Sequence, residues 1–163
     1  MTGERWTTTD SPIGTITVVG GPEGVSGLYM EDHRHRPSLA DDAVRDDALF
    51  APLLSELAEY FAGERTTFEA PVAFDRGTPF QRRVWAALLE VPYGETTSYG
   101  ALAARLGQPG GSRAVGLANG KNPVSIVVPC HRVVGSDGAL TGYGGGTERK
   151  RFLLDLERGG RLF

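Results

Sequence analysis

The chain has 163 residues, of which 40% are hydrophobic and 23% are charged, values that are ordinary for a globular protein with a buried core. No apolar run approaches the roughly 20 residues that cross a membrane, and no basic and apolar leader opens the chain, so we expect a cytoplasmic protein. The single cysteine excludes an internal disulfide and the cysteine clusters of structural zinc sites.

The charge is distributed unevenly along the chain. The net charge of −3 divides into −8 for residues 1–76, with 6 basic and 14 acidic side chains, and +5 for residues 77–163, with 11 basic and 6 acidic side chains. A basic carboxy-terminal half suits a polyanionic partner such as nucleic acid, but it also fits an ordinary solvated surface. We place a domain boundary between these two segments.

The first residues of the amino-terminal half predict a small sheet. Residues 7–19 alternate polar and β-branched side chains around a Ser-Pro-Ile-Gly turn, which predicts a hairpin, and residues 25–30 predict a third strand. Residues 31–47 are polar and acidic and predict a long surface loop. We expect its histidines, His33 and His35, to be solvated rather than to bind a metal.

A helix follows this loop. Asp46 or Asp47 can cap its first turn and Gly63 ends it. One more strand is expected over residues 66–74. This half has no catalytic constellation, so its expected role is structural support. The predicted apolar face of the helix comprises Leu49, Phe50, Leu53, Leu54, Leu57, Tyr60 and Phe61.

The carboxy-terminal half begins with a strong helix signal. Thr78 and Gln81 form a capping box around Pro79, which occupies the first helical position. Gly94 lies in the Val-Pro-Tyr-Gly segment that breaks this helix. The predicted buried stripe comprises Phe80, Val84, Trp85, Leu88 and Leu89.

Two short helices in tandem come next. Ser98 caps residues 99–106 and Ser112 caps residues 113–119, which predicts a helix-turn-helix. The second helix is nearly bare, so it either packs tightly on a neighbouring helix or presses into the minor groove of DNA. Its small residues are Ala114, Gly116, Ala118 and Gly120.

The only cysteine follows an apolar run. Residues 124–128 predict a short buried strand that Pro129 ends, which leaves Cys130 at the strand exit. His131 and Arg132 follow directly, and both favour a thiolate over a thiol. A lone cysteine is most often a small buried hydrophobe, but a nucleophile, a base and a cation in consecutive positions favour catalysis.

The last segment predicts a β-turn, a glycine-rich loop and a helix. Residues 133–140 read as strand, Asp-Gly turn and strand, and residues 142–146 form a loop that we interpret as an active-site wall. A helix is expected over residues 147–158, and its spacing alone favours a solvated Glu157. The side chains predicted to be buried in this helix are Phe152, Leu153 and Leu156.

Taken together, these motifs resemble the O6-alkylguanine-DNA alkyltransferases, also called methylated-DNA protein-cysteine methyltransferases. The resemblance covers roughly residues 77–158, whereas residues 10–14 and 60–63 match only loosely. The matching segments are Phe80 to Trp85, Val91 to Thr96, Ser98-Tyr99, Arg113 to Gly116, Asn122-Pro123, Pro129 to Val133 and Gly142 to Gly145.

This resemblance implies an α+β fold, with a small amino-terminal α/β domain of ribonuclease H-like type and a mostly helical carboxy-terminal domain that carries the helix-turn-helix. It implies direct-reversal DNA repair, in which Cys130 takes the alkyl group from a flipped-out O6-alkylguanine irreversibly, without a metal or a cofactor. The implied partner is double-stranded DNA, bound through its minor groove, and no membrane. O4-alkylthymine as a second substrate and cooperative self-association on DNA stay open.

The resemblance also assigns roles to particular residues. His131 is the base, acting through a water, Glu157 orients its ring, and Asn122 braces the turn before the cysteine. Arg113 fills the space that the flipped nucleotide leaves, and the Tyr99 hydroxyl donates to guanine N3. The other implied substrate and DNA positions are Ser112, Ala114, Gly116, Val133, Tyr143 and Gly144.

Within that set, the Gly144 N–H serves guanine O6, the carbonyls of Cys130 and Val133 accept from the exocyclic amine, and Tyr143 lines the pocket. Some family members carry serine at the position of Gly144, which puts tolerance for bulky alkyl groups in doubt.

Two other functions fit parts of the pattern. A damage-binding relative without chemistry would share the helix-turn-helix but lack the cysteine, so Cys130 argues against it. A cysteine hydrolase could use Cys130, His131 and Glu157 for acyl transfer, and multiple turnover on an ester or amide would support it.

Overall fold

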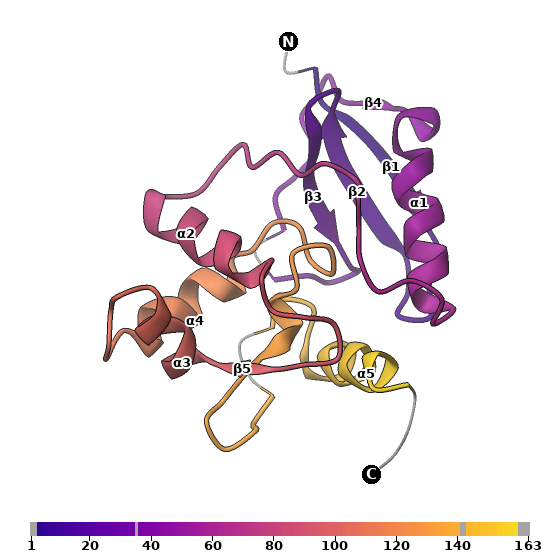
Figure 1. Cartoon of the computed structure of the whole chain (residues 1–163). Coiled ribbons are helices and arrows are strands. Elements are labelled where there is room, and N and C mark those ends of the chain that lie inside the picture. Colours follow the sequence, from indigo (N-terminus) through magenta and orange to yellow (C-terminus); the bar gives the residue numbers. More distant parts are fainter. Residues whose placement is uncertain (1–2, 35, 141–142, 160–163) are drawn as a thin grey trace.

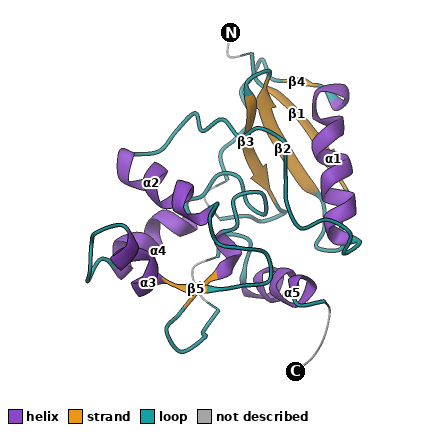
Figure 2. Ribbon diagram, viewed as in Figure 1, coloured by secondary structure: helices purple, strands orange, loops and turns teal. Residues whose placement is uncertain are grey.

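The computed structural model describes residues 3–34, 36–140 and 143–159, and its two halves differ in architecture (Figure 1). The first half is a four-stranded sheet with one long helix, and the second half consists mostly of helices and irregular segments (Figure 2). The mixed α+β fold expected from the sequence is therefore confirmed.

An antiparallel hairpin and a third strand form the amino-terminal sheet, as predicted. β1 (Arg5–Thr9) pairs with β2 (Ile16–Gly21), which pairs with β3 (Gly24–Tyr29). β4 (Val44–Arg45) joins the other edge of β1 in parallel orientation, so the strand order is β3-β2-β1-β4. A two-residue strand has no periodic pattern, which is why only a loop is predicted there.

The helix α1 (Asp47–Phe61) runs along the sheet and packs on β1 (Figure 1). It begins at the predicted cap, because the Asp46 side chain accepts a hydrogen bond from Leu49 N at 3.0 Å. Gly63 follows its last turn at a φ of 77°, a conformation that favours glycine. The buried side chains of its apolar face are Phe50, Leu53, Leu57 and Tyr60.

The prediction of a strand over residues 66–74 is wrong. This segment makes only an isolated bridge between Val72 and Val25 on β3, beside Pro71, which has no N–H to give to a ladder. The buried Glu56 carboxylate holds the segment, accepting from Glu69 N at 2.9 Å and from Ala70 N at 3.1 Å. Side-chain hydrogen bonds therefore replace a sheet here.

The helical half follows the predicted order. α2 (Pro79–Leu88) has the complete capping box of Thr78 and Gln81. Its buried Trp85 donates from Nε1 to the Ala118 carbonyl oxygen at 2.9 Å and so holds α2 against the second helix of the helix-turn-helix.

The helix-turn-helix consists of α3 (Tyr99–Arg105) and α4 (Ser112–Gly120), which pack against each other. Ser98 caps α3 as predicted, accepting from Ala101 N at 3.0 Å. The cap predicted at Ser112 is wrong, because Gly111 is the cap position and Ser112 is already helical.

The prediction of a buried strand over residues 124–128 is also wrong. The segment is buried but winds through tight turns, and Val124 alone makes an isolated bridge, to Leu28 on β3. The Asn122 side chain accepts from Val124 N at 3.0 Å and donates to the Val128 carbonyl at 2.8 Å. An asparagine that closes a turn on both sides outweighs the β-propensity of the valines.

After the short 3₁₀ helix Cys130–Arg132, β6 (Val133–Val134) pairs in parallel with β5 (Thr97–Ser98). The second strand predicted within residues 133–140 does not form, although Gly138 N donates to the Gly135 carbonyl in a tight turn.

The last helix, α5 (Thr147–Glu157), is where it was predicted. Leu153 is buried as expected, but Phe152 keeps 38% of its surface exposed, so its predicted burial is wrong. Leu154 is buried on the inner face instead. The predicted residue Gly142 of the preceding loop lies outside the described residues.

His33 differs from the expectation of a solvated histidine. It is 8% exposed, and its Nδ1 accepts a hydrogen bond from Met30 N at 3.1 Å. Its ring packs edge-on against Tyr29, with ring centroids 5.5 Å apart. His35 lies outside the described residues.

Within the described ranges, none of the helices combines the length and the apolar character needed to cross a membrane.

The Glu56 carboxylate generates a prediction about stability. Replacing Glu56 with alanine leaves two backbone N–H groups without their acceptor and Arg65 without an ion pair at 3.1 Å. We expect the free energy of unfolding to fall by about 2 to 4 kcal/mol in urea titrations. The control is Glu59→Ala, which removes an exposed carboxylate paired with the same arginine and should change stability by less than about 1 kcal/mol. Equal effects of the two substitutions would contradict this account.

Candidate active site

The 3₁₀ helix presents three consecutive buried side chains. Cys130, His131 and Arg132 have exposed fractions of 3%, 0% and 7%. The turn that precedes them is buried, and α5 packs directly against them. Cys130 therefore lies in a helical turn rather than at the end of a strand.

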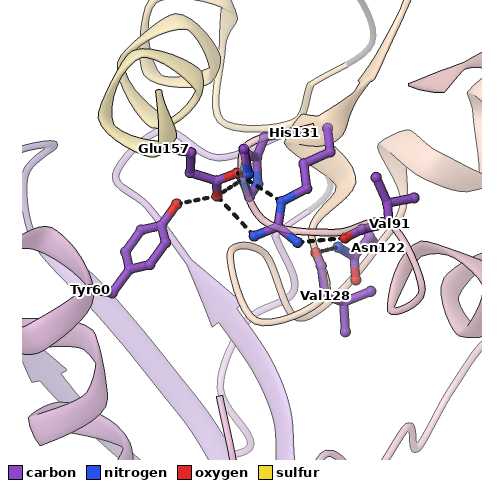
Figure 3. A network of polar contacts seen from close by, with 8 residues as sticks. Tyr60, Val91, Asn122, Val128, His131 and Glu157 are labelled. Atoms are coloured by element: carbon purple, nitrogen blue, oxygen red, sulfur yellow. Dashed lines mark hydrogen bonds and ion pairs between the residues drawn. The ribbon is translucent and has the colours of Figure 1, made fainter. Parts of the chain in front are cut away.

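Glu157, at the end of α5, accepts hydrogen bonds from three parts of the chain, which are the 3₁₀ helix and α1 (Figure 3) and the turn at Gly94. Its Oε2 lies 2.6 Å from His131 Nε2, and its two oxygens accept from Arg132 Nε at 2.8 Å and Nη2 at 3.0 Å. The Tyr60 hydroxyl donates to Oε2 at 2.6 Å, and Gly94 N donates to Oε1 at 3.2 Å. The helical spacing alone favoured a solvated Glu157, and this prediction is therefore wrong.

Arg132 is held by more than this carboxylate. Its Nη1 donates to the Val91 carbonyl at 2.7 Å, and its guanidinium lies over the Tyr93 ring at 5.7 Å from the centroid. The buried cation is thus paired with an anion and satisfied by hydrogen bonds, which a buried charge requires.

The carboxylate and the imidazole have well-defined protonation states. Burial alone would raise the pKa of Glu157, but hydrogen bonds from His131, Arg132 and Tyr60 lower it to about 2. Burial lowers the pKa of His131 despite the neighbouring carboxylate, so its ring is neutral near pH 7. A neutral ring facing an ionised carboxylate donates its proton from Nε2, which assigns the lone pair to Nδ1.

Nδ1 of His131 is buried and has no hydrogen-bond partner among the described residues. A buried, unpaired ring nitrogen is costly to keep in a core, and such groups concentrate at reactive sites. His131, the base expected from the sequence, is therefore oriented by Glu157 through Nε2, and its Nδ1 has a lone pair available to accept a proton.

Burial raises the pKa of the Cys130 thiol, so the resting sulfur is protonated. The groups that favour the thiolate are Asn122 and Ser125, through hydrogen bonds, and Lys150, through its charge. The expectation that Arg132 supplies this charge is wrong, because its guanidinium is paired with Glu157.

Two asparagines brace the segment around the sulfur. Asn122 closes the turn that leads to Cys130, and Asn119, at the end of α4, donates from Nδ2 to the Cys130 carbonyl at 3.2 Å. The predicted helix-turn-helix is thereby bonded directly to the backbone of the cysteine.

Lys150 is fully buried and was not among the residues predicted for the site. Burial lowers its pKa to about 8, although the nearby Cys130 opposes this shift. Its Nζ donates to the Val133 carbonyl and lies 5.8 Å from the centroid of the Tyr99 ring. The ammonium thus links three positions that the sequence analysis names separately.

The implied DNA-contacting residues lie on one exposed side of α4. Ser112, Arg113 and Ala114 are exposed, while Val115 and Ala118 face the core. Gly116 is half-buried, and a side chain there would contact the Tyr99 ring at 3.7 Å. The bare helix therefore packs closely on its inner side, as one interpretation of its small residues predicts, and its first turn is exposed.

Two family models match the chain. The model described as 6-O-methylguanine DNA methyltransferase, ribonuclease-like domain, matches residues 5–74. The model described as 6-O-methylguanine DNA methyltransferase, DNA binding domain, matches residues 79–159. The chain belongs to the 6-O-methylguanine DNA methyltransferase family.

Individual relatives agree with this assignment. The methylated-DNA–protein-cysteine methyltransferase of Mycobacterium tuberculosis (strain ATCC 25618 / H37Rv) is 51% identical over 154 residues, which cover 94% of this chain and 92% of the relative. The protein of the same name from Methanosarcina acetivorans is 46% identical over 148 residues, with coverages of 91% and 94%. The crystal structure of Mycobacterium tuberculosis OGT in complex with DNA has a TM-score of 0.88 at 49% identity, covering 95% of this chain and 93% of that one.

The family resemblance read from the sequence is thus confirmed, but two residues that contact the candidate site were missed. Lys150 lies seven residues before Glu157 and three before Leu153, so helical spacing alone places it on the buried face of α5. Tyr60 was read only as part of an apolar stripe, yet its hydroxyl bonds Glu157. Aromatic residues with a polar tip need a partner when buried, which was the available signal. The amino-terminal half therefore does more than support the fold.

The depressed pKa of Glu157 generates a prediction about pH. A group whose folded pKa is about 2 and whose ordinary pKa is 4.5 stabilises the fold above pH 4.5 and loses that contribution as the pH falls towards 2. Glu157→Gln should lower the free energy of unfolding at pH 7 by about 3 kcal/mol and flatten its decline between pH 4.5 and 2. Urea titrations across this pH range measure both effects.

The control for this experiment is Glu90→Gln, which neutralises an exposed carboxylate paired with Arg105 at 2.7 Å. It should leave stability at pH 7 within about 1 kcal/mol of the wild type and keep the decline at low pH. A Glu157 variant with the pH profile of the wild type would contradict the lowered pKa.

Proposed function

We propose that this protein repairs alkylated DNA by direct reversal, transferring the alkyl group of O6-alkylguanine to the sulfur of Cys130. The observation that carries the proposal is the buried pair of Glu157 and His131, which orients a neutral imidazole directly beside the only cysteine. The names of the relatives, methylated-DNA–protein-cysteine methyltransferases, support the same reaction.

The reaction begins with a thiol, because burial raises the pKa of Cys130. His131 Nδ1 removes the thiol proton through a bridging water, and the ionised Glu157 stabilises the imidazolium that forms. The sulfur attacks the alkyl carbon, a carbon–sulfur bond forms, and the bond from that carbon to O6 breaks. The Lys150 ammonium, Asn122 and Ser125 favour the sulfur anion during attack.

The leaving guanine takes the bonding electrons, its negative charge is stabilised by hydrogen bonds, and it gains one proton from water as His131 returns the thiol proton to water. The Tyr99 hydroxyl donates to N3 and the Gly144 N–H donates to O6, while Tyr143 lines the pocket. The carbonyls of Cys130 and Val133 accept from the exocyclic amine. The Val133 carbonyl accepts one side-chain hydrogen bond, from Lys150, and its second lone pair serves the base. The Cys130 carbonyl already accepts from Asn119 Nδ2 and from Val133 N, so the base shares an acceptor site with one of these donors.

The DNA is bound through the minor groove by α4. A bare helix can approach the groove floor closely, and its exposed residues Ser112, Arg113 and Ala114 meet the duplex first. Arg113 fills the stack where the target nucleotide has been extruded, since an alkyl carbon inside the duplex cannot reach a buried sulfur. The family model for a DNA binding domain covers this helix and supports this assignment.

The two halves of the chain divide the work. We assign residues 1–76 to a structural domain that also contributes the Tyr60 hydrogen bond to Glu157, and residues 77–163 to the domain that binds DNA and transfers the alkyl group. The net charges of −8 and +5 favour placing the DNA on the second domain, and the separate matches of two family models support the boundary.

The product is S-alkylcysteine, and no group in the site is placed to hydrolyse a thioether. Each molecule therefore reacts once. This stoichiometry separates alkyl transfer from a cysteine hydrolase, which would turn over repeatedly on an ester or an amide.

Replacing Cys130 with serine tests the nucleophile. We expect transfer from an O6-methylguanine duplex to be abolished, with DNA affinity within about threefold of the wild type, because a serine hydroxyl is a far weaker nucleophile of similar size. Intact-mass spectrometry with peptide mapping follows the methyl group, and fluorescence anisotropy follows binding. Transfer that survives in the variant would overturn the proposal.

Replacing Arg113 with alanine tests extrusion. The rate constant with duplex substrate should fall about 10- to 100-fold, while reaction with free O6-benzylguanine base stays within about twofold, because only the duplex requires extrusion. Arg45→Ala removes an exposed cation from the amino-terminal half and serves as the charge control. Equal losses on both substrates would count against extrusion by Arg113.

A further inference from the structure

Three consecutive glycines follow Tyr143, and residues of the amino-terminal half contact the first two of them. Arg34 N donates to the Gly144 carbonyl at 2.8 Å, although the two residues are more than one hundred positions apart. The Tyr143 hydroxyl lies 3.9 Å from Met30 Sδ, which also lies 2.6 Å from where a side chain at Gly145 would begin.

Gly144 is required by space rather than by backbone conformation. Its φ lies outside the left-handed region, so an alanine would face no conformational strain there. A Cβ at this position would instead lie 2.7 Å from His33 Nε2 and 3.0 Å from His33 Cδ2. His33 therefore occupies the volume that a side chain at position 144 would need.

His33 cannot move aside without breaking other contacts. Its Nδ1 accepts from Met30 N at 3.1 Å, and its ring packs edge-on against Tyr29 with ring planes at 87°. It is 8% exposed. A ring fixed by a hydrogen bond and an aromatic neighbour acts as a rigid wall behind the Gly144 backbone.

The loop is tied to the amino-terminal half at a second point. Arg149, in the first turn of α5, donates from Nε to the Ile13 carbonyl at 3.1 Å and from Nη1 to the Gly145 carbonyl at 3.3 Å. With Arg34 bonded to Gly144, both glycines have their carbonyls held. The loop therefore has little conformational freedom, because the His33 ring packs against Gly144 and the carbonyls of both glycines accept hydrogen bonds.

This loop leads directly into the reactive centre. Tyr143 is 4% exposed, and burial, followed by the proximity of Cys130, raises the pKa of its hydroxyl. In the proposed reaction, the Gly144 N–H contacts O6, the atom that carries the alkyl group. Displacing Gly144 by a fraction of an ångström would therefore change the room available beside that oxygen.

We propose that His33 is a positioning residue that sets which alkyl groups are accepted, because it fixes Gly144 beside the alkylated oxygen. The inference rests on the proposed function and adds to it a specificity determinant in the amino-terminal half. With His33 in place, the loop holds a geometry suited to a small alkyl group. Without the outer part of its ring, the loop can yield to a larger group.

A double-mutant cycle of His33→Asn and Gly144→Ala tests this coupling. Asparagine keeps an acceptor for Met30 N close to the position of Nδ1 but removes Nε2, the atom nearest to position 144. Single-turnover rate constants are measured with duplexes containing O6-methylguanine or O6-benzylguanine, and thermal unfolding is measured for each variant.

Gly144→Ala alone should lower the methyl-transfer rate constant about tenfold or more, because a displaced loop misplaces the substrate. The double variant should return to within about threefold of His33→Asn. His33→Asn alone should raise the benzyl-to-methyl rate ratio about tenfold, which a purely structural role would leave unchanged. This last measurement decides the matter even if Gly144→Ala fails to fold.

The matched control is Asp32→Asn, an exposed residue of the same turn with a φ of 55°, which asparagine also tolerates. It should leave both rate constants and their ratio unchanged. Additive losses in the double variant, or an unchanged rate ratio in His33→Asn, would overturn the inference while leaving the proposed function intact. A wild-type protein that transfers no alkyl group from either duplex would overturn the proposed function itself.

Discussion

The buried carboxylate of Glu157 is the interaction on which the site depends. It joins the end of α5 to His131 and Arg132 on the 3₁₀ helix, to Tyr60 on α1 and to the turn at Gly94. A carboxylate at 6% exposure is unfavourable unless it is paired and hydrogen-bonded, and here the donors come from three separate parts of the chain, which are the 3₁₀ helix, α1 and the turn at Gly94. Forming the charge therefore requires the fold to be complete, and the same charge orients the imidazole beside the cysteine.

In the proposed reaction, the thiol of Cys130 stays protonated until the substrate binds. Burial raises the pKa of Cys130, so the free thiol is neutral, and lowers the pKa of Lys150 to about 8. A neutral thiol tolerates a dry pocket and reacts slowly with solutes, whereas a base oriented by Glu157 can take its proton once substrate is bound. In the proposed reaction, the nucleophile is therefore activated after the substrate binds.

The two halves of the chain share the site more closely than their sequences indicate. Tyr60 contributes a hydrogen bond to the Glu157 carboxylate, and His33 lies behind the backbone of Gly144 in the glycine loop that begins at Tyr143. An acidic domain that only supported its basic neighbour would need no such contacts. Because both residues are buried at the junction, changes in the amino-terminal half reach the reactive centre through packing and hydrogen bonds.

The sequence by itself determined the features that local chemistry controls. Helix ends at Asp46 and Thr78 were predictable because a cap is made within four residues, and the family was readable because the motif around Cys130 is contiguous. Tertiary structure decided the rest. The valines before Cys130 form turns rather than a strand because Asn122 closes the chain on itself. The family resemblance already named Glu157, but its burial and its partners, and the presence of Lys150 beside the cysteine, were decided only when α5 packed against the 3₁₀ helix. Burial sets these charges and pKa values, and burial belongs to the assembled fold rather than to any segment of it.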